Sequence, residues 1–217
     1  MVKRALVLAN GERQVDRNYF HNLRKRVDTL ICADGGAKFA LQLGLKPDRI
    51  FGDLDSINPD VKERYEKMGI EFVLFPAEKD KTDTHLILDY LIAEGYKEVF
   101  VGGAFGGRPD HFMGNLVLLN YGHQYGVKVK LVSPTVEIQI LEGELVIEGH
   151  KGDTFSLIPV DHVVRGVTLK GFKYSLTDAE IFRESTLAIS NIIVSDQARV
   201  KIKEGRAFLF IISRSEV

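Results

Sequence analysis

The chain has 217 residues, of which 45% are apolar and 27% charged, a composition that predicts a folded, soluble protein with one large or two small domains. Its 29 basic and 30 acidic side chains give a formal net charge of −1, which argues against nucleic-acid binding driven by bulk positive charge. The single cysteine, Cys32, excludes an internal disulfide framework and a cysteine-rich zinc site, and it fits a reducing, cytoplasmic compartment. The apolar runs are too short for a signal peptide or a membrane span.

The first 130 residues alternate short apolar runs with helical patterns. Strands are predicted at 5–9, 29–33, 49–51, 72–75 and 99–101, and helices at 35–43, 59–68, 83–94 and 110–125. Gly44 ends the first of these helices as a C-terminal cap, and Thr82 or Asp83 caps the third. Strands separated by helices at this spacing predict βαβ units and a mostly parallel sheet.

The pattern changes after about Lys130, where short apolar runs follow one another without helical patterns. These runs are 137–140, 144–147, 155–160, 163–169, 186–194, 200–203 and 207–212. Glu142-Gly143 between the first two predicts a hairpin. We therefore predict a helix-flanked, mostly parallel α/β domain at 1–130 and an antiparallel β-sandwich at 131–217, with the boundary between Lys128 and Pro134.

Polar clusters follow the predicted parallel strands, where open α/β sheets bind their ligands. Asp34-Gly35-Gly36 allows a close backbone approach to an anion at a helix N-terminus, or it forms only a tight turn. Asp53 and Asp55, two positions apart in a loop, are suited to holding a divalent cation, or they make local turn hydrogen bonds.

Two further clusters combine positive charge with carboxylates or glycines. The first, Lys79-Asp80-Lys81-Thr82-Asp83, can neutralise phosphate and add metal-binding or proton-accepting carboxylates, or it is a charged surface turn. The second spans 102–111 and contains Gly103, Gly106, Gly107, Arg108 and Asp110. Its glycines let backbone amides face a ligand, and its arginine supplies a planar fork for phosphate oxygens. It matches neither the P-loop nor the G-x-G-x-x-G pattern.

The four clusters together predict Mg²⁺-nucleotide polyphosphate chemistry. Phosphoryl-type transfer depends on positioning and charge neutralisation more than on a covalent nucleophile. Lys79, Lys81 and Arg108 are expected to bind phosphate oxygens. Asp83 or Asp110 is expected to accept the proton of the hydroxyl group that receives the transferred group, or to orient that hydroxyl.

The ordered segments GDLDS (52–56), KDKTD (79–83) and GGAFGGRPDH (102–111), with ADGGA (33–37) and Ser190-Asn191, resemble the thiamine pyrophosphokinase (thiamine diphosphokinase) family. The resemblance covers nearly the whole chain. It implies Mg²⁺-dependent transfer of pyrophosphate from ATP to the thiamine hydroxyl, which gives AMP and thiamine diphosphate. It also implies an N-terminal ATP-binding catalytic domain, a C-terminal thiamine-binding domain, and a homodimer with thiamine at the subunit interface. No nucleic-acid or membrane partner is expected.

The expected site residues follow from the clusters and from this resemblance. The metal is expected on Asp53, Asp55 and Asp83, and these three with Arg108 and Asp110 form the catalytic set. The expected nucleotide-binding residues are Asp34, Gly35, Gly36, Lys79, Asp80, Lys81, Thr82, Gly103, Gly106 and Gly107. The resemblance places Ser190 and Asn191 on the thiamine side, with Tyr174 where relatives frequently have a tryptophan that stacks on thiamine.

Two alternatives remain open at this point. One is a different Mg²⁺-nucleotide-dependent transferase, acting for instance on a pterin or a sugar. The other is a non-catalytic thiamine- or nucleotide-binding module. Formation of AMP, rather than ADP or free pyrophosphate, distinguishes pyrophosphoryl transfer from both.

Overall fold

The computed structural model describes residues 2–11, 14–53, 57, 59–75 and 80–214. The chain divides into two compact units, Met1–Pro134 and Thr135–Val217. Within the described ranges, no helix is long and apolar enough to cross a membrane.

The first unit is built on a six-stranded parallel sheet. Its strands are β1 (Arg4–Leu8), β2 (Thr29–Ala33), β3 (Arg49–Gly52), β4 (Glu71–Leu74), β5 (Glu98–Gly102) and β6 (Lys128–Val132), and they lie in the order β6-β5-β1-β2-β3-β4. All of the pairings between them are parallel, so the predicted mostly parallel sheet is confirmed. The chain starts near the middle at β1, runs to one edge through β4, and resumes on the other side of β1 at β5.

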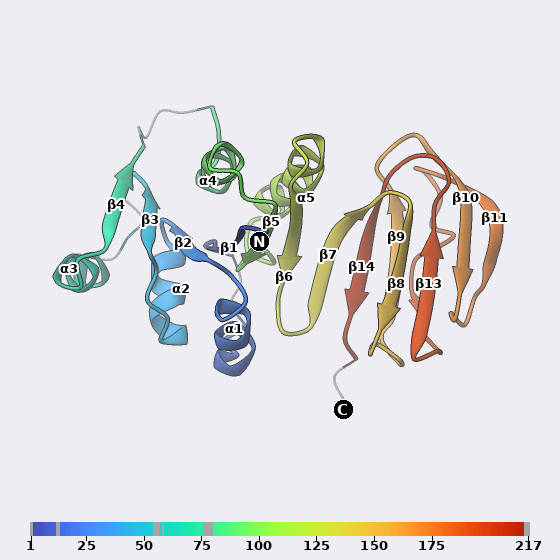
Figure 1. The fold of residues 1–217 in the computed structure, drawn as a ribbon, viewed down its shortest axis with the longest axis horizontal. Coiled ribbons are helices and arrows are strands. Elements are labelled where there is room, and N and C mark those ends of the chain that lie inside the picture. Colours follow the sequence, from blue (N-terminus) through green and yellow to red (C-terminus); the bar gives the residue numbers. More distant parts are fainter. Residues whose placement is uncertain (1, 12–13, 54–56, 58, 76–79, 215–217) are drawn as a thin grey trace. The chain divides into compact units, whose positions relative to one another are not determined.

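Helices cover both faces of this sheet. They are α1 (Arg17–Arg24), α2 (Gly36–Leu43), α3 (Pro59–Lys67), α4 (Asp83–Ala93) and α5 (Pro109–Gln124). In Figure 1, α1 and α2 lie on one face of the sheet, and α4 and α5 on the other. The reversal of direction at β1 explains this arrangement, because right-handed crossovers that run in opposite directions place their helices on opposite faces.

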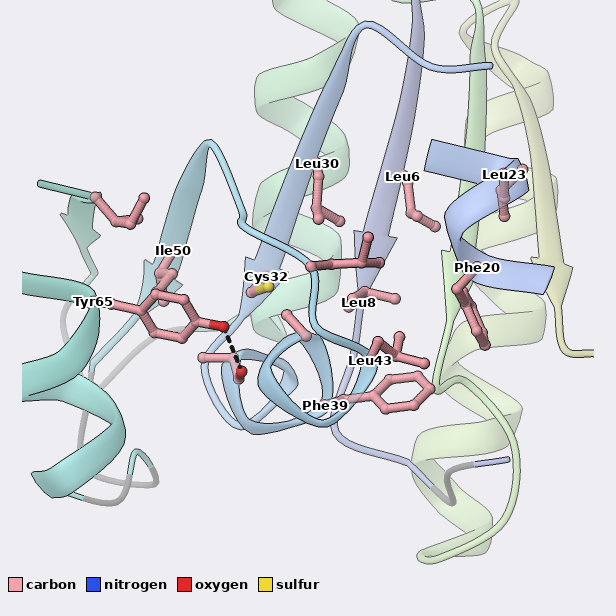
Figure 2. Packing of buried hydrophobic residues seen from close by; sticks show 14 of the residues in the cluster. Leu6, Leu8, Phe20, Leu23, Leu30, Cys32, Phe39, Leu43, Ile50 and Tyr65 are labelled. Atoms are coloured by element: carbon pink, nitrogen blue, oxygen red, sulfur yellow. Dashed lines mark hydrogen bonds between the residues drawn. The ribbon is translucent and has the colours of Figure 1, made fainter. Parts of the chain in front are cut away.

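The core beneath α1, α2 and α3 is a continuous apolar cluster, part of which Figure 2 shows. Its labelled members are Leu6, Leu8, Phe20, Leu23, Leu30, Cys32, Phe39, Leu43, Ile50 and Tyr65. The Phe20 and Phe39 rings pack edge to face with centroids 5.2 Å apart. The Tyr65 hydroxyl donates to the Ala37 carbonyl at 3.1 Å, which satisfies its polar end inside the core. Cys32 is fully buried, and this burial raises the pKa of its thiol, so it acts as a packing residue.

Local signals set where the helices begin and end. Gly44 caps α2 in the left-handed conformation with a φ of 71°, as its position predicted. Thr82 is the N-cap of α4, and its hydroxyl accepts from the His85 amide at 3.3 Å. Helix α1 was not predicted from the sequence. Its start is fixed by Asp16, whose carboxylate accepts from the Tyr19 amide at 2.9 Å.

The second unit is an antiparallel β-sandwich, as predicted. One sheet has the order β12-β9-β14-β7 and the other β11-β10-β13-β8. The strands are β7 (Val136–Leu141), β8 (Glu144–Glu148), β9 (Thr154–Pro159), β10 (Val163–Lys170), β11 (Leu176–Phe182), β12 (Asn191–Ile192), β13 (Gln197–Lys201) and β14 (Ala207–Ile212). Side chains from both sheets form one buried cluster, with Phe155 and Leu209 from the first sheet and Val167 and Val200 from the second.

Two details of this unit correct the sequence interpretation. The predicted hairpin around Gly143 is wrong, because β7 pairs with β14 while β8 pairs with β13. The turn instead carries the chain from one sheet to the other. The predicted strand at 186–194 is also wrong in extent, because the segment contains turn and bend residues and only Asn191–Ile192 forms a strand. Its apolar residues are spread among the turns rather than along one extended run.

The start of α2 generates a test of backbone packing. A Cβ at Gly36 would lie 1.9 Å from the Leu8 carbonyl oxygen, so we expect Gly36→Ala to lower the free energy of unfolding by about 2–3 kcal/mol. The matched control is Gly114→Ala in α5, where a Cβ would meet nothing within 4 Å and helix propensity favours alanine by about 1 kcal/mol. Urea unfolding measures both. A Gly36→Ala protein as stable as the wild type contradicts the close approach.

Candidate active site

The first unit contains a pocket of about 570 Å³ where β1, β2 and β5 end. Strand β1 pairs with β2 on one side and β5 on the other, and the order of crossovers reverses there. This is the switch point at which open α/β sheets leave a crevice for ligands. The N-terminal residues of α4 and α5 complete the lining.

The pocket brings together predicted residues from three segments of the chain. Those that line it are Asp34, Gly35, Thr82, Asp83, Gly103, Gly106, Gly107, Arg108 and Asp110. Gly36, Asp53, Asp80 and Lys81 are not among the lining residues. Asp55 and Lys79 lie outside the described residues, and the predicted thiamine-side residues belong to the second unit.

Asp34 lies at the inner side of this pocket. It is only 6% exposed and has a φ of 34°, a left-handed conformation that is uncommon for a residue with a side chain. Its amide donates to the Phe51 carbonyl at 2.7 Å. A Cβ at the next residue, Gly35, would lie 2.3 Å from the Asn10 side chain. Glycine there lets the end of β1 and the start of α2 meet around the carboxylate.

Asp53 is half-buried and directly follows β3. A Cβ on its neighbour Gly52 would lie 2.9 Å from the Asp34 Cβ. The ends of β2 and β3 therefore bring the first two predicted acidic clusters next to each other, although only the first lines the pocket.

The glycine-rich segment after β5 forms another wall. Gly103, Gly106 and Gly107 have φ values of 66°, 63° and 64°, which glycine adopts without steric cost. The Gly11 amide donates to the Gly103 carbonyl at 2.6 Å, so this loop is tied to the residues after β1. Asn115 fixes it from α5, because its amide nitrogen donates to the Ala104 carbonyl at 3.1 Å.

Arg108 and Asp110 form a two-point ion pair at the start of α5. Arg108 Nε donates to Asp110 Oδ1 at 3.1 Å, and the Arg108 terminal nitrogen donates to Oδ2 at 2.5 Å. Hydrogen bonds from Arg108 lower the pKa of Asp110 to about 2. The carboxylate is therefore a poor proton acceptor at neutral pH, and it holds the plane of the guanidinium at the pocket edge.

Lys81 forms an ion pair with a residue of the same unit. Its ammonium lies 2.6 Å from Asp89 Oδ2 on α4. Asp80, one residue earlier, is exposed. Of this cluster, Thr82 and Asp83 are the predicted residues that reach the pocket lining.

Sequence reasoning missed several residues of the pocket. Asn10, Gly11, Thr84 and Asn115 all line it. Asn10-Gly11 follows β1 as the other clusters follow their strands, so the same strand-end signal was available. Asn115 is an interior residue of α5, and nothing in the local sequence marks it.

The three predicted thiamine-side residues lie in the second unit: Tyr174 in a loop, and Ser190 and Asn191 at the start of β12. Asn191 is 3% exposed; its oxygen accepts from the Tyr174 amide at 3.0 Å and its nitrogen donates to the Tyr174 carbonyl at 2.7 Å. Ser190 has a φ of 61°, and its amide donates to Ser156 Oγ at 3.0 Å. Asn191 thus clamps the backbone at Tyr174, while 60% of the tyrosine is exposed.

The chemistry of the pocket's side chains fits a hard cation. Asp34, Asp83 and Asp110 offer carboxylate oxygens along the lining, and such oxygens are the ligands that Mg²⁺ prefers. Among the described residues, no group of three or more His, Cys, Asp or Glu side chains is arranged to hold a metal ion.

Comparisons with known proteins agree with this division of the chain. The family model "Thiamin pyrophosphokinase, catalytic domain" matches residues 20–131. The family model "Thiamin pyrophosphokinase, vitamin B1 binding domain" matches residues 137–207. The α/β unit, with the pocket at its switch point, and the β-sandwich thus correspond to the two domains of one family of enzymes. The chain belongs to the thiamin pyrophosphokinase family, whose members are transferases of thiamine diphosphate biosynthesis.

Individual relatives support the same assignment. Thiamine pyrophosphokinase of Bacillus subtilis (strain 168) is 35% identical over 177 residues, which cover 81% of this chain and 83% of the relative. The crystal structure of the Bacillus subtilis protein has a TM-score of 0.87 at 29% identity and covers 98% of this chain and 100% of its own. That of thiamin pyrophosphokinase from Geobacillus thermodenitrificans has a TM-score of 0.84 at 30% identity and covers 98% and 99%.

The Arg108–Asp110 pair predicts an unusual titration. In a carbon-13 NMR titration the Asp110 carboxyl should change its shift near pH 2, and in Arg108→Gln it should titrate near the ordinary value of about 3.9. The folded-state pKa is depressed, so any stability the pair contributes is present above about pH 3.9 and is lost as the pH falls towards 2. An unchanged midpoint in the variant contradicts the pairing.

The Asn191 clamp predicts a loss of stability. Asn191→Ala leaves the Tyr174 amide and carbonyl without their side-chain partners, which should lower the free energy of unfolding by about 1–3 kcal/mol. Gln197→Ala is the control, because Gln197 makes its side-chain hydrogen bond to Glu148 on the surface and its loss should cost under about 0.5 kcal/mol. Equal effects of the two substitutions in urea unfolding would count against the clamp.

Proposed function

We propose that this protein transfers the pyrophosphoryl group of ATP to the hydroxyl of thiamine with Mg²⁺, which gives AMP and thiamine diphosphate. The observation that carries the proposal is the pocket at the switch point. It joins carboxylates, glycine backbone and an arginine within the segment matched by the catalytic family model.

The nucleotide phosphates are assigned to the glycine-lined side of this pocket. Gly106 and Gly107 expose backbone there, and a Cβ at Gly107 would meet nothing within 4 Å. The N-termini of α4 and α5 both reach the lining, and helix N-termini favour anions. Arg108, held by Asp110, presents its guanidinium to the phosphate oxygens.

The metal is assigned to Asp53, Asp55 and Asp83; of these, Asp83 lines the pocket together with Asp34. Bound Mg²⁺ would supply charge neutralisation at the transferred group. Arg108 and the glycine backbone would hold the phosphate chain so that the thiamine hydroxyl faces the β-phosphorus. The hydroxyl oxygen bonds to that phosphorus, the bridge to the α-phosphate breaks, and AMP leaves. A pocket carboxylate takes the hydroxyl proton, and the low pKa of Asp110 makes Asp110 a poor acceptor for it.

Thiamine is assigned to the loops that contain Tyr174 and Ser190, in the segment matched by the B1-binding family model. The exposed Tyr174 ring offers a face to the cationic thiazolium, with its backbone fixed by Asn191. We further propose that the active species is a homodimer with thiamine at the subunit interface.

The direct test is product identification. The protein is incubated with Mg²⁺-ATP and thiamine, and both products are identified by mass. The proposal expects AMP and thiamine diphosphate in equal amounts. Formation of ADP or free pyrophosphate indicates a different transferase, and ligand binding without AMP indicates a non-catalytic module.

Asp83→Asn tests the assigned carboxylate at nearly constant side-chain volume. We expect turnover to fall by about 10²-fold or more, because the negative charge at the pocket is removed while the first turn of α4 is kept. Asp196→Asn is the control, since Asp196 is a highly exposed carboxylate of the second unit. The same product assay gives the rates. Near-wild-type turnover of Asp83→Asn would falsify its role.

A further inference from the structure

A polar cluster joins α4 to α5 outside the pocket lining. Asp89 on α4 accepts from the Lys81 ammonium at 2.6 Å through one oxygen and from the Tyr121 hydroxyl at 2.6 Å through the other. The Lys81 ammonium also lies 5.8 Å from the centre of the Tyr121 ring. The Asp89 carboxylate on α4 is thus shared by Lys81, which precedes the N-cap of α4, and by Tyr121 on α5.

His85 adds a second tie between the same elements. Its ring packs edge to face on the Tyr121 ring with centroids 4.5 Å apart. Its backbone amide donates to the hydroxyl of Thr82, the N-cap of α4. The first turn of α4 is therefore held to α5 on both sides of Thr82.

The charges in this cluster stabilise the ion pair between Lys81 and Asp89. Burial of Asp89 raises its pKa, but hydrogen bonds from Lys81 and Tyr121 outweigh burial, so its pKa is below the usual range. Burial lowers the pKa of His85, and the Lys81 ammonium, 2.6 Å away, is the positive charge that faces Asp89.

The position of the cluster connects it to the pocket. Lys81 immediately precedes Thr82 and Asp83, which line the pocket, whereas Lys81 itself does not. Helix α5 also begins at the pocket, after Arg108. A link between the two helices therefore sets the spacing of the groups at their N-termini.

We propose that Asp89 is a positioning residue, which holds Lys81 and Tyr121 and so fixes Thr82 and Asp83 at the pocket edge. Lys81 then acts as an anchor for the start of α4 rather than as a ligand of the nucleotide phosphates. The kinetic part of this inference rests on the proposed function.

A double-mutant cycle separates the anchor from a phosphate ligand. Lys81→Met, Asp89→Asn and the double variant are compared with the wild type for kcat and for KM of ATP. The anchor predicts a loss in kcat of about tenfold in each single variant, because small displacements of catalytic groups are costly. The double variant should show about the same tenfold loss as each single variant and no more, because both substitutions break one interaction. The KM for ATP should stay within about twofold.

Other kinetic patterns overturn the proposal. If Lys81 binds phosphate, Lys81→Met raises the KM for ATP while Asp89→Asn, which frees the lysine, leaves turnover near wild type. Multiplied losses in the double variant also contradict a shared interaction. The control is Glu63→Gln on α3, which breaks an exposed pair with Lys67 of the same 2.6 Å length and should leave kcat and KM unchanged.

Amide hydrogen exchange gives a readout that does not depend on activity. The Leu86 amide donates to the Thr82 carbonyl at 3.0 Å in the first turn of α4. We expect it to exchange about threefold faster or more in both Lys81→Met and Asp89→Asn, with global stability checked by urea unfolding and Glu63→Gln unchanged. Unaltered exchange in either variant overturns the anchor. Absence of AMP with the wild type would instead overturn the proposed function, and exchange would still decide the anchor.

Discussion

The first unit depends on the close packing of backbone against backbone where β1 ends. A side chain at Gly36 would meet the Leu8 carbonyl at 1.9 Å, and one at Gly103 would meet the Ala9 carbonyl at 2.5 Å. These contacts bring the start of α2 and the loop after β5 onto the end of the same strand. Because nothing larger than hydrogen fits between them, the two segments converge, and their polar groups border one pocket.

The charged groups of the pocket are placed by helix ends rather than by the sheet alone. Asp83 lies in the first turn of α4 and Asp110 in the first turn of α5. A helix end can move unless its flanks are fixed, and here Asn115 holds the loop before α5 while Asp89 holds the residue before the cap of α4. Support of this kind, from residues far from these groups in the sequence, fixes the positions of the side chains at the pocket.

In the second unit, too, a buried polar side chain fixes the position of a neighbouring segment. The oxygen and the nitrogen of the buried Asn191 side-chain amide both hydrogen-bond to the backbone at Tyr174. Asn191 therefore shapes this loop. The resemblance pointed to Ser190 and Asn191 as thiamine-side residues. The residue type alone does not distinguish a side chain that contacts a ligand from one that holds the loop in contact with the ligand.

The sequence by itself determined the class of fold and most of the strand-end clusters. Hydrophobic runs bounded by glycine and by capping residues depend on nearby positions, so the parallel sheet, Gly44 and Thr82 could be predicted, and the ordered motifs identified the family. Only the tertiary structure decided the partners. Glu142-Gly143 has the local signature of a hairpin, but the partners of β7 and β8 come from β14 and β13. Lys81 pairs with Asp89 rather than lining the pocket, and Asn115 reaches the glycine loop from inside a helix. Local sequence patterns reflect the conformational preference of each residue. Strand pairing and the choice of ion-pair partner depend instead on distant segments, which compete for the same hydrogen bonds and the same buried space.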